Sequence, residues 1–215
     1  MELLTLDIKT GNGNDSLTLL KTTVDGKSAI KMSGGDDYLL TVLSSFFDDV
    51  SINTAKHDDT ILFVSTFFGD DDNHELNIIT SKGEDYVAFI GVPEFVFDCD
   101  IGFDIPPFVV IDAPTFADTV NIKMDIGDDT VVVGDCAFID NLNLNMGKHD
   151  NVLIVHVDIP NIANLNFIGA EPIVVETDFP EFEAIDEVIG YLTDFFGRGG
   201  DVFALIECFI IVDAF

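Results

Sequence analysis

The sequence predicts an all-β fold, a parallel β-solenoid of about eight ~22-residue coils with a C-terminal helix-plus-strand cap. Three observations carry this prediction. A short acidic turn recurs at a nearly fixed period, apolar residues alternate on both sides of each turn, and the 215-residue chain is both acidic and apolar. It has 40 Asp+Glu against 9 Lys+Arg, a net charge of -31, and 47% hydrophobic residues. Disordered acidic chains are poor in apolar residues, so the composition favours a folded chain.

The recurring turn has Thr or Met followed five residues later by an anchor, Asp or Asn. The six copies are TGNGNDSLTL from Thr10, MSGGDDYLLTV from Met32, TAKHDDTILFV from Thr54, TSKGEDYVAFI from Thr80, MDIGDDTVVVG from Met124 and MGKHDNVLIVHV from Met146. Weaker anchors at Pro106 and Pro172 complete eight copies, with spacings of 22, 22, 26, 21, 23, 22 and 21. The long spacing coincides with GDDDNHE, residues 69–75, which predicts a loop inserted into one coil.

Each repeat has the size of one solenoid coil, with two or three short strands. Apolar residues alternate around each turn, which is the period of a strand with one buried face. The expected inward pairs are Leu17 and Leu19, Ile61 and Phe63, Val87 and Phe89, and Val131 and Val133. A further inward position is expected in mid-repeat, at Val24, Phe46, Phe67 and Phe138. One coil cannot bury its apolar face alone, but stacked coils bury it continuously.

The competing fold is an antiparallel β-sandwich, which also has short strands with turn signals. A fixed period with a fixed turn motif favours the solenoid. The repeat stops after Glu176, so we expect a repeat domain over residues 1–176 and a cap over residues 177–215. Residues 179–197 have helical apolar spacing, and residues 201–212 are expected to form a buried strand. This cap would cover the sheet edge of the last coil, whereas the first coil has no such cover.

Composition also excludes several functions. A net charge of -31 and a single Arg, Arg198, argue against binding nucleic-acid backbones or anionic membrane surfaces. No apolar stretch approaches the ~18 residues of a membrane span, so no membrane insertion is expected. The N-terminus lacks the basic and apolar regions of a signal peptide. Cys99, Cys136 and Cys208 are too few for a disulfide framework and are expected to be buried thiols.

The segment GNGNDSL, residues 11–17, fits the G-x-G-x-D-x-apolar turn of repeats-in-toxin (RTX) modules, and SGGDDYL, residues 33–39, is close to it. The chain resembles RTX-like and other acidic parallel β-helix repeat proteins over most of residues 3–176. Modules of the RTX family repeat every nine residues, whereas this motif occurs once per ~22 residues. The resemblance implies a solenoid, Ca²⁺ as a cofactor, and an extracellular or cell-surface location.

Charge repulsion between neighbouring turns gives a separate physical reason to expect calcium binding. In register, the turn residues stack into two acidic columns, and like charges ~5 Å apart repel by about 1 kcal/mol per pair in water. Calcium would relieve this repulsion because it prefers carboxylate oxygens. The candidate ligands are Asn14, Asp15, Asp36, Asp37, Asp58, Asp59, Glu84, Asp85, Asp128 and Asp129. The alternative is that each Asp accepts backbone N–H bonds in its own turn, with one column facing water.

Two other groups of residues are weaker metal candidates. The inserted loop carries Asp70, Asp71, Asp72 and Glu75, which are more typical of a solvated loop tip. The chain has four histidines, His57, His74, His149 and His156. Of these, His57 and His149 share the KHD context four coils apart, so they cannot share an ion and are expected to be surface turn residues.

The function predicted from these patterns is structural and non-enzymatic. The uncovered first coil could accept another chain, giving a homo-oligomer or a head-to-tail polymer. The alternatives are a calcium-binding module of a surface or secreted protein, and a β-helix enzyme acting on polysaccharides. Uniform acidic columns do not resemble the paired carboxylates in different environments that hydrolysis needs, and no catalytic motif occurs. An acidic surface suited to high salt is a further possibility, since salt screens self-repulsion.

Overall fold

The computed structural model describes residues 2–69, 74–95, 111–113, 115–134, 137–156, 162–167 and 173–177. In these residues the fold is an all-β solenoid of parallel strands, as the period predicts, and the alternative antiparallel sandwich is wrong. The solenoid unit comprises Met1–Val92 and Ala113–Thr177. A second unit includes Pro93–Asp112, and its described residues lie in a two-stranded sheet of β13 (Val92–Phe95) and β14 (Ile111–Ala113).

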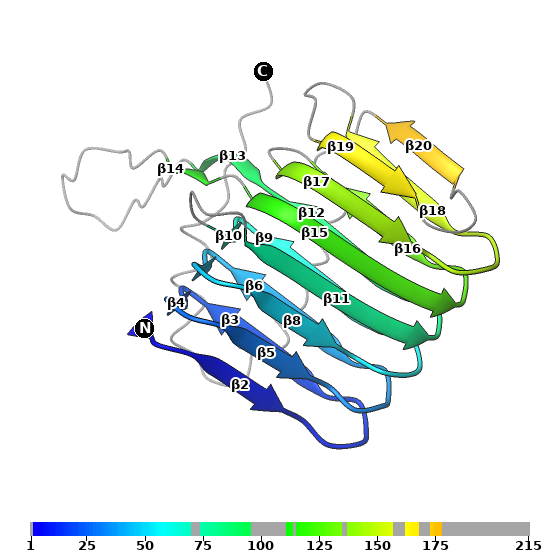
Figure 1. Cartoon of the computed structure of the whole chain (residues 1–215), viewed down its shortest axis with the longest axis horizontal. Coiled ribbons are helices and arrows are strands. Elements are labelled where there is room, and N and C mark those ends of the chain that lie inside the picture. Colours follow the sequence, from blue (N-terminus) through cyan, green and yellow to red (C-terminus); the bar gives the residue numbers. More distant parts are fainter. Residues whose placement is uncertain are drawn as a thin grey trace, which may run out of the picture. The chain divides into compact units, whose positions relative to one another are not determined.

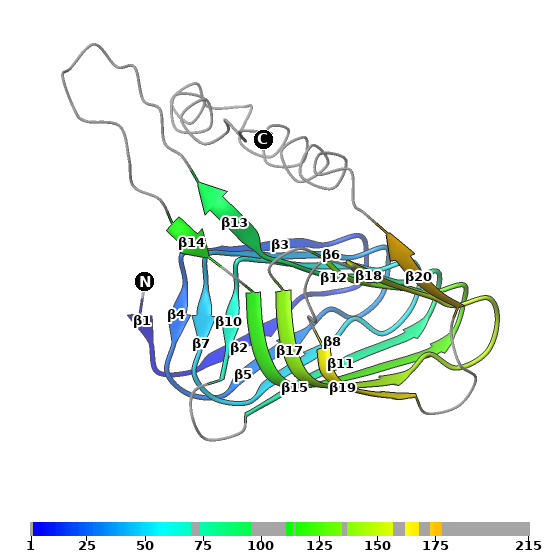
Figure 2. The same cartoon turned by 90° about the horizontal axis from the view of Figure 1, so that it is seen from above.

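Two sheets form the solenoid, and Figures 1 and 2 show their strands stacked side by side. The seven-stranded sheet consists of β3 (Ser16–Leu20), β6 (Tyr38–Val42), β9 (Thr60–Val64), β12 (Tyr86–Ile90), β16 (Thr130–Val133), β18 (Val152–His156) and β20 (Ile173–Thr177). Successive strands of this sheet pair in parallel and in register, so that Leu17, Leu39, Ile61 and Val87 form one row. The stack makes about six turns.

The second sheet has eleven strands in the described residues, four short ones from the first coils and seven long ones. The short strands are β1 (Glu2–Leu3), β4 (Thr23–Val24), β7 (Ser45–Phe46) and β10 (Phe67–Phe68). The long strands are β2 (Leu6–Lys9), β5 (Ser28–Lys31), β8 (Val50–Asn53), β11 (Glu75–Lys82), β15 (Thr115–Ile126), β17 (Ala137–Asn145) and β19 (Ile162–Phe167). In β15 one continuous strand pairs with both β10 and β11, so it combines the two roles.

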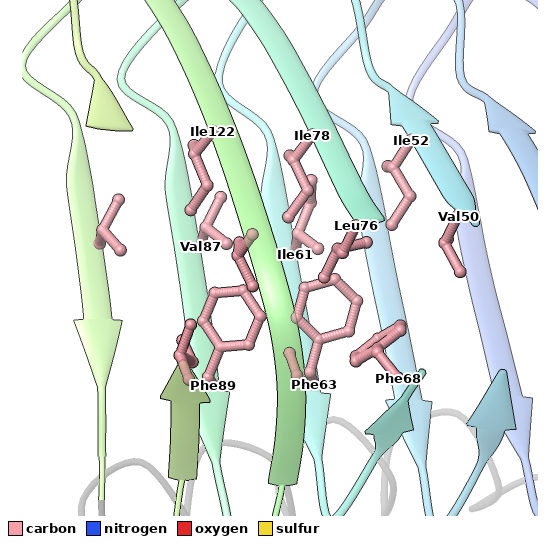
Figure 3. Packing of buried hydrophobic residues seen from close by; sticks show 14 of the residues in the cluster. Val50, Ile52, Ile61, Phe63, Phe68, Leu76, Ile78, Val87, Phe89 and Ile122 are labelled. Carbon is pink, nitrogen blue, oxygen red and sulfur yellow. The ribbon is translucent and has the colours of Figure 1, made fainter. Parts of the chain in front are cut away.

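The core lies between the two sheets and is filled by the alternating apolar residues that the sequence indicates. Ile61, Phe63, Val87 and Phe89 are fully buried (Figure 3). Phe63 stacks on Phe89 with ring centroids 4.9 Å apart. It also meets Phe68 edge to face at 5.0 Å. The first pair joins successive coils and the second joins the two sheets within one coil, and each is worth about 0.5–1.5 kcal/mol beyond the burial of its area.

The mid-repeat position was predicted one residue too early in two coils. Val24 and Phe46 point inward as expected, but the next residue in their row is Phe68 rather than Phe67. The row continues through Ala117 to Ile139, so Phe138 is also off by one. Phe67 lies on the other face of the short strand, where it stacks on Phe116 at 5.5 Å. Both residues of the Phe67–Phe68 pair are apolar, so the sequence alone leaves the inward one undetermined.

The predicted coil anchored at Pro106 is wrong. Strand β12 pairs directly with β16, in register from Tyr86 with Thr130 to Phe89 with Val133. Residues 93–112 therefore interrupt the repeat without adding a coil to it. Strand β20 follows the predicted Pro172 anchor and pairs with β18 from Val152 with Ile173. Among the described residues this sheet has seven strands, where eight coils were expected.

Several predictions fall outside the described residues. These are the loop residues Asp70–Asp72, the three cysteines, the anchor residues Pro106 and Pro172, and the cap over residues 177–215 apart from Thr177. Among the described residues no helix is long and apolar enough to cross a membrane.

We expect replacement of Phe63 by Ala to destabilise the solenoid by about 3–5 kcal/mol, because it removes two ring contacts and leaves a cavity between coils. Phe67→Ala is the matched control, because Phe67 is only partly buried and should lose less than about 2 kcal/mol. Urea unfolding followed by circular dichroism measures both variants. Equal losses in the two variants would contradict this account of the core.

Candidate functional site

The first acidic column predicted from the turns is buried and forms a hydrogen-bond ladder between coils. Asp37, Asp59, Asp85 and Asp129 expose only 1–2% of their surface, and Asn151 exposes 3%. The backbone N–H of each anchor donates to the Oδ1 atom of the anchor in the next coil. The five bonds run from Asp15 to Asp37, from Asp37 to Asp59, from Asp59 to Asp85, from Asp85 to Asp129 and from Asp129 to Asn151, at 2.9–3.0 Å.

This arrangement differs from the predicted alternative to calcium in one respect. Each carboxylate from Asp37 to Asp129 does accept a backbone N–H, but from the neighbouring coil rather than from its own turn. A buried N–H without an acceptor destabilises a fold by about 1–3 kcal/mol, so each anchor satisfies a donor and fixes the register of two coils at once. Asn151 shows that an amide oxygen serves equally well, and its Nδ2 also donates to the Met146 carbonyl at 2.7 Å.

The ladder agrees with the strand pairing that the predicted Pro106 coil is not present between β12 and β16. The Asp85 N–H donates directly to Asp129, 44 residues further along the chain.

Burial raises the pKa of these carboxyl groups. The pKa of Asp59 rises to about 7, chiefly through desolvation and also through the neighbouring Asp85 and Asp37. Desolvation likewise raises the pKa of Asp129 to about 6, and it raises the pKa values of Asp37 and Asp85. The Oδ2 atoms of Asp37 and Asp129 are buried and have no hydrogen-bond partner among the described residues. At Asp59 a hydrogen bond from the Thr54 side chain opposes the rise in pKa. Protonation of Oδ2 reduces the penalty of burying such an atom as part of an anion.

The second acidic column is exposed and forms a ladder in the opposite direction. The backbone N–H of Glu84 donates to Asp58 Oδ1 in the preceding coil at 2.9 Å. In the same way the N–H of Asp150 donates to Asp128 Oδ1 at 3.3 Å. Asp36 and Asn14 form a reciprocal pair, in which Asn14 Nδ2 donates to Asp36 Oδ2 at 3.3 Å and the Asp36 N–H donates to Asn14 Oδ1 at 2.9 Å. The predicted calcium ligands Asp36, Asp58, Glu84 and Asp128 belong to this column, and they are exposed to water.

The turn glycines have a backbone role. Gly13, Gly35 and Gly83 adopt φ values of 117°, 132° and 148°, a left-handed region that L residues rarely enter. A Cβ at Gly35 would collide with the backbone of Gly13 in the preceding coil. This requirement accounts for the Gly of the RTX-like motif without any bound ion. His57 and His149 also have positive φ, 81° and 97°, at their turns, and both are exposed, as predicted for surface turn residues.

A buried hydroxyl ladder at another corner of the coil was not predicted from the sequence. The Thr22 N–H donates to Ser44 Oγ at 3.1 Å, and the Thr66 N–H donates to Thr115 Oγ1 at 3.2 Å. Thr66 Oγ1 also donates to the Thr41 carbonyl. The signal was a Thr or Ser recurring after 22 residues at positions 22, 44 and 66. This signal is weak because Ser and Thr are also common in ordinary loops, where they form no ladder.

The end of the stack formed by the first coil has open sheet edges. Among the described strands, β2 pairs only with β5, and β3 pairs only with β6. Leu6, Ile8 and Leu17 pack against the core but are only partly buried. The side chains of Leu4 and Leu20 are 80% and 48% exposed. Strand β3, with the sequence SLTLL, carries none of the charges, prolines or bulges that usually protect an edge from pairing.

These features define the class of the protein, a parallel β-solenoid whose coils are joined at their corners by side-chain ladders. Comparison of the chain with protein-family models, curated proteins and solved structures gave no match. The function is therefore argued from the chain's own residues.

We predict that the stability of the solenoid falls as pH rises from about 4 to about 7. The folded-state pKa values of Asp59 and Asp129 lie above the usual 3.8, so in this range the folded form binds more protons than the unfolded form. A pKa difference of one between the two states corresponds to about 1.4 kcal/mol. Asp59→Asn should raise stability at neutral pH and flatten this dependence, because Asn151 already serves as an anchor.

Asp58→Asn is the control, because it removes the same formal charge from the exposed column while retaining an oxygen that accepts the Glu84 N–H. Urea unfolding of both variants and the parent chain at several pH values between about 4 and 8 measures the slope. A parent whose stability rises across this range, or equal flattening by both substitutions, would contradict the role of the buried ladder.

Proposed function

We propose that this chain is a non-enzymatic structural protein that associates with further copies of itself through the open edge of its first coil. The observation that carries the proposal is the edge of β2 and β3, which have no strand paired on their outer side among the described residues. At this edge the core residues Leu6, Ile8 and Leu17 are only partly buried. Such an edge is a template for pairing with another strand. The resulting assembly would be a homo-oligomer or a head-to-tail polymer.

The ladder chemistry supports this association. Asp15 begins the buried column, and its N–H is already bonded to Asp37. Its carboxylate occupies the place where every other anchor accepts an N–H from a preceding coil. A strand added at this edge would supply that donor, and it would also cover Leu17 and Leu6.

We expect the weight-average mass to rise with protein concentration, and to rise further with added salt, because salt screens the repulsion between highly acidic copies. Thr18→Pro should keep the chain a single copy. The Lys21 N–H bonds to Val42 O, and N–H direction alternates along a strand, so the Thr18 N–H points to the open edge. Proline there removes an edge donor without breaking a bond to β6.

Thr18→Ser retains the donor and should associate like the parent. Sedimentation equilibrium over a wide concentration range measures the masses, with circular dichroism showing that each variant is folded. A parent of constant single-copy mass at every concentration and salt level would refute the proposal, as would association of Thr18→Pro equal to that of the parent.

Calcium binding is a second candidate, favoured by the exposed column, where Asp58 and Asp128 lie on the face open to water. In this role Ca²⁺ would bridge carboxylates of successive coils and reduce their repulsion. We expect millimolar CaCl₂ to raise the melting temperature more than equal MgCl₂, and the joint substitution Asp58→Asn, Glu84→Gln to remove the difference. Equal shifts with the two salts would indicate screening of charge instead.

A further inference from the structure

One group of potential metal ligands lies away from both acidic columns, where the chain enters two successive long strands. Asp48 and Asp49 precede β8, and His74 precedes β11. Because Leu76 pairs with Val50, His74 occupies the same position in its coil that Asp48 occupies in the coil before. The register therefore brings an imidazole next to two carboxylates that are 25 and 26 residues distant in sequence.

The geometry of these three side chains suits a small divalent cation. His74 Nδ1 lies 3.8 Å from Asp48 Oδ1 and 3.8 Å from Asp49 Oδ1. One ligand atom from each residue lies within 4.8 Å of the other two. Ligands about 2.0–2.2 Å from a zinc ion are separated by roughly 3.3–4.3 Å, so small rotations of these side chains would bring all three into contact with one ion.

Two backbone hydrogen bonds hold the carboxylates in place. Asp48 Oδ1 accepts the Asp49 N–H at 2.7 Å, and Asp49 Oδ1 accepts the Glu75 N–H at 3.2 Å. Lys27 binds the other oxygen of Asp49, Oδ2, at 2.8 Å, so Oδ1 remains directed toward the imidazole. The Lys27 ammonium also lowers the pKa of Asp49, so this carboxyl group is ionised at neutral pH, as a metal ligand must be.

We propose that Asp48, Asp49 and His74 form a binding site for a zinc-type divalent cation, with further positions filled by water. An imidazole nitrogen with two carboxylates favours Zn²⁺ and its neighbours over Ca²⁺, which takes oxygen ligands. The side chains of His74 and Asp48 are 21% and 30% exposed, so the site is partly shielded yet open to ions from solution. The bound ion would join two coils beside the inserted loop, in addition to their strand pairing.

The test is calorimetric titration of chelator-treated full-length protein with Zn²⁺, in excess Mg²⁺ so that unspecific acidic positions are occupied. We expect one stoichiometric site, weakened at least tenfold by His74→Ala and by Asp49→Asn. His57→Gly is the matched control, since it removes a histidine beside Asp58 and Asp59 at a turn position that is glycine in neighbouring coils. This variant should bind Zn²⁺ like the parent.

Substitution of Co²⁺ gives an independent readout, because its visible spectrum changes when a nitrogen ligand binds, and this change should be lost in His74→Ala but kept in His57→Gly. Zn²⁺ titrations that are the same for the parent and His74→Ala would overturn the proposal and leave His74 as an ion-pair partner of the two carboxylates. Equal weakening by His57→Gly would overturn it too, by assigning the ion to the acidic surface in general.

Discussion

The structure depends on one hydrogen bond, repeated at each turn, from the backbone N–H of one anchor to the side-chain oxygen of the anchor in the next coil. A solenoid turn leaves buried N–H groups that strand pairing does not satisfy, and an interior without water makes each of them unfavourable. The anchor side chain meets this need and also sets which coil stacks on which. The hydroxyl ladder through Ser44 and Thr115 does the same at another corner.

This constraint explains how a chain with a net charge of -31 can have acidic residues inside it. The carboxylates of the buried ladder are placed as acceptors, and desolvation favours their neutral form, as the pKa of about 7 for Asp59 shows. The exposed ladder carries its negative charge into water. The acidic composition therefore combines two populations, one that joins coils and whose raised pKa values reduce its negative charge, and one that keeps the surface negative.

The same constraint shows how much of the fold the sequence could predict. The period of the anchors and the alternation around them predicted the parallel coils and inward residues such as Ile61 and Phe63, because both patterns follow from strand geometry. Spacing alone predicts a coil at Pro106, but the direct pairing of β12 with β16 leaves no coil between them. The direction of Phe67 and the proximity of His74 to Asp48 depend on register between coils, which no local pattern contains.

The ladder also has a polarity that bears on how copies would meet. In the buried column every bond runs from an N–H to a carboxylate in the following coil, so the first coil presents its Asp15 carboxylate outward as an acceptor. Two first coils meeting face to face would oppose two acceptors and two acidic turns, which is electrostatically unfavourable. An edge that offers N–H donors would satisfy Asp15 and continue the ladder. The corner chemistry therefore favours head-to-tail association over a symmetric pairing of two first coils.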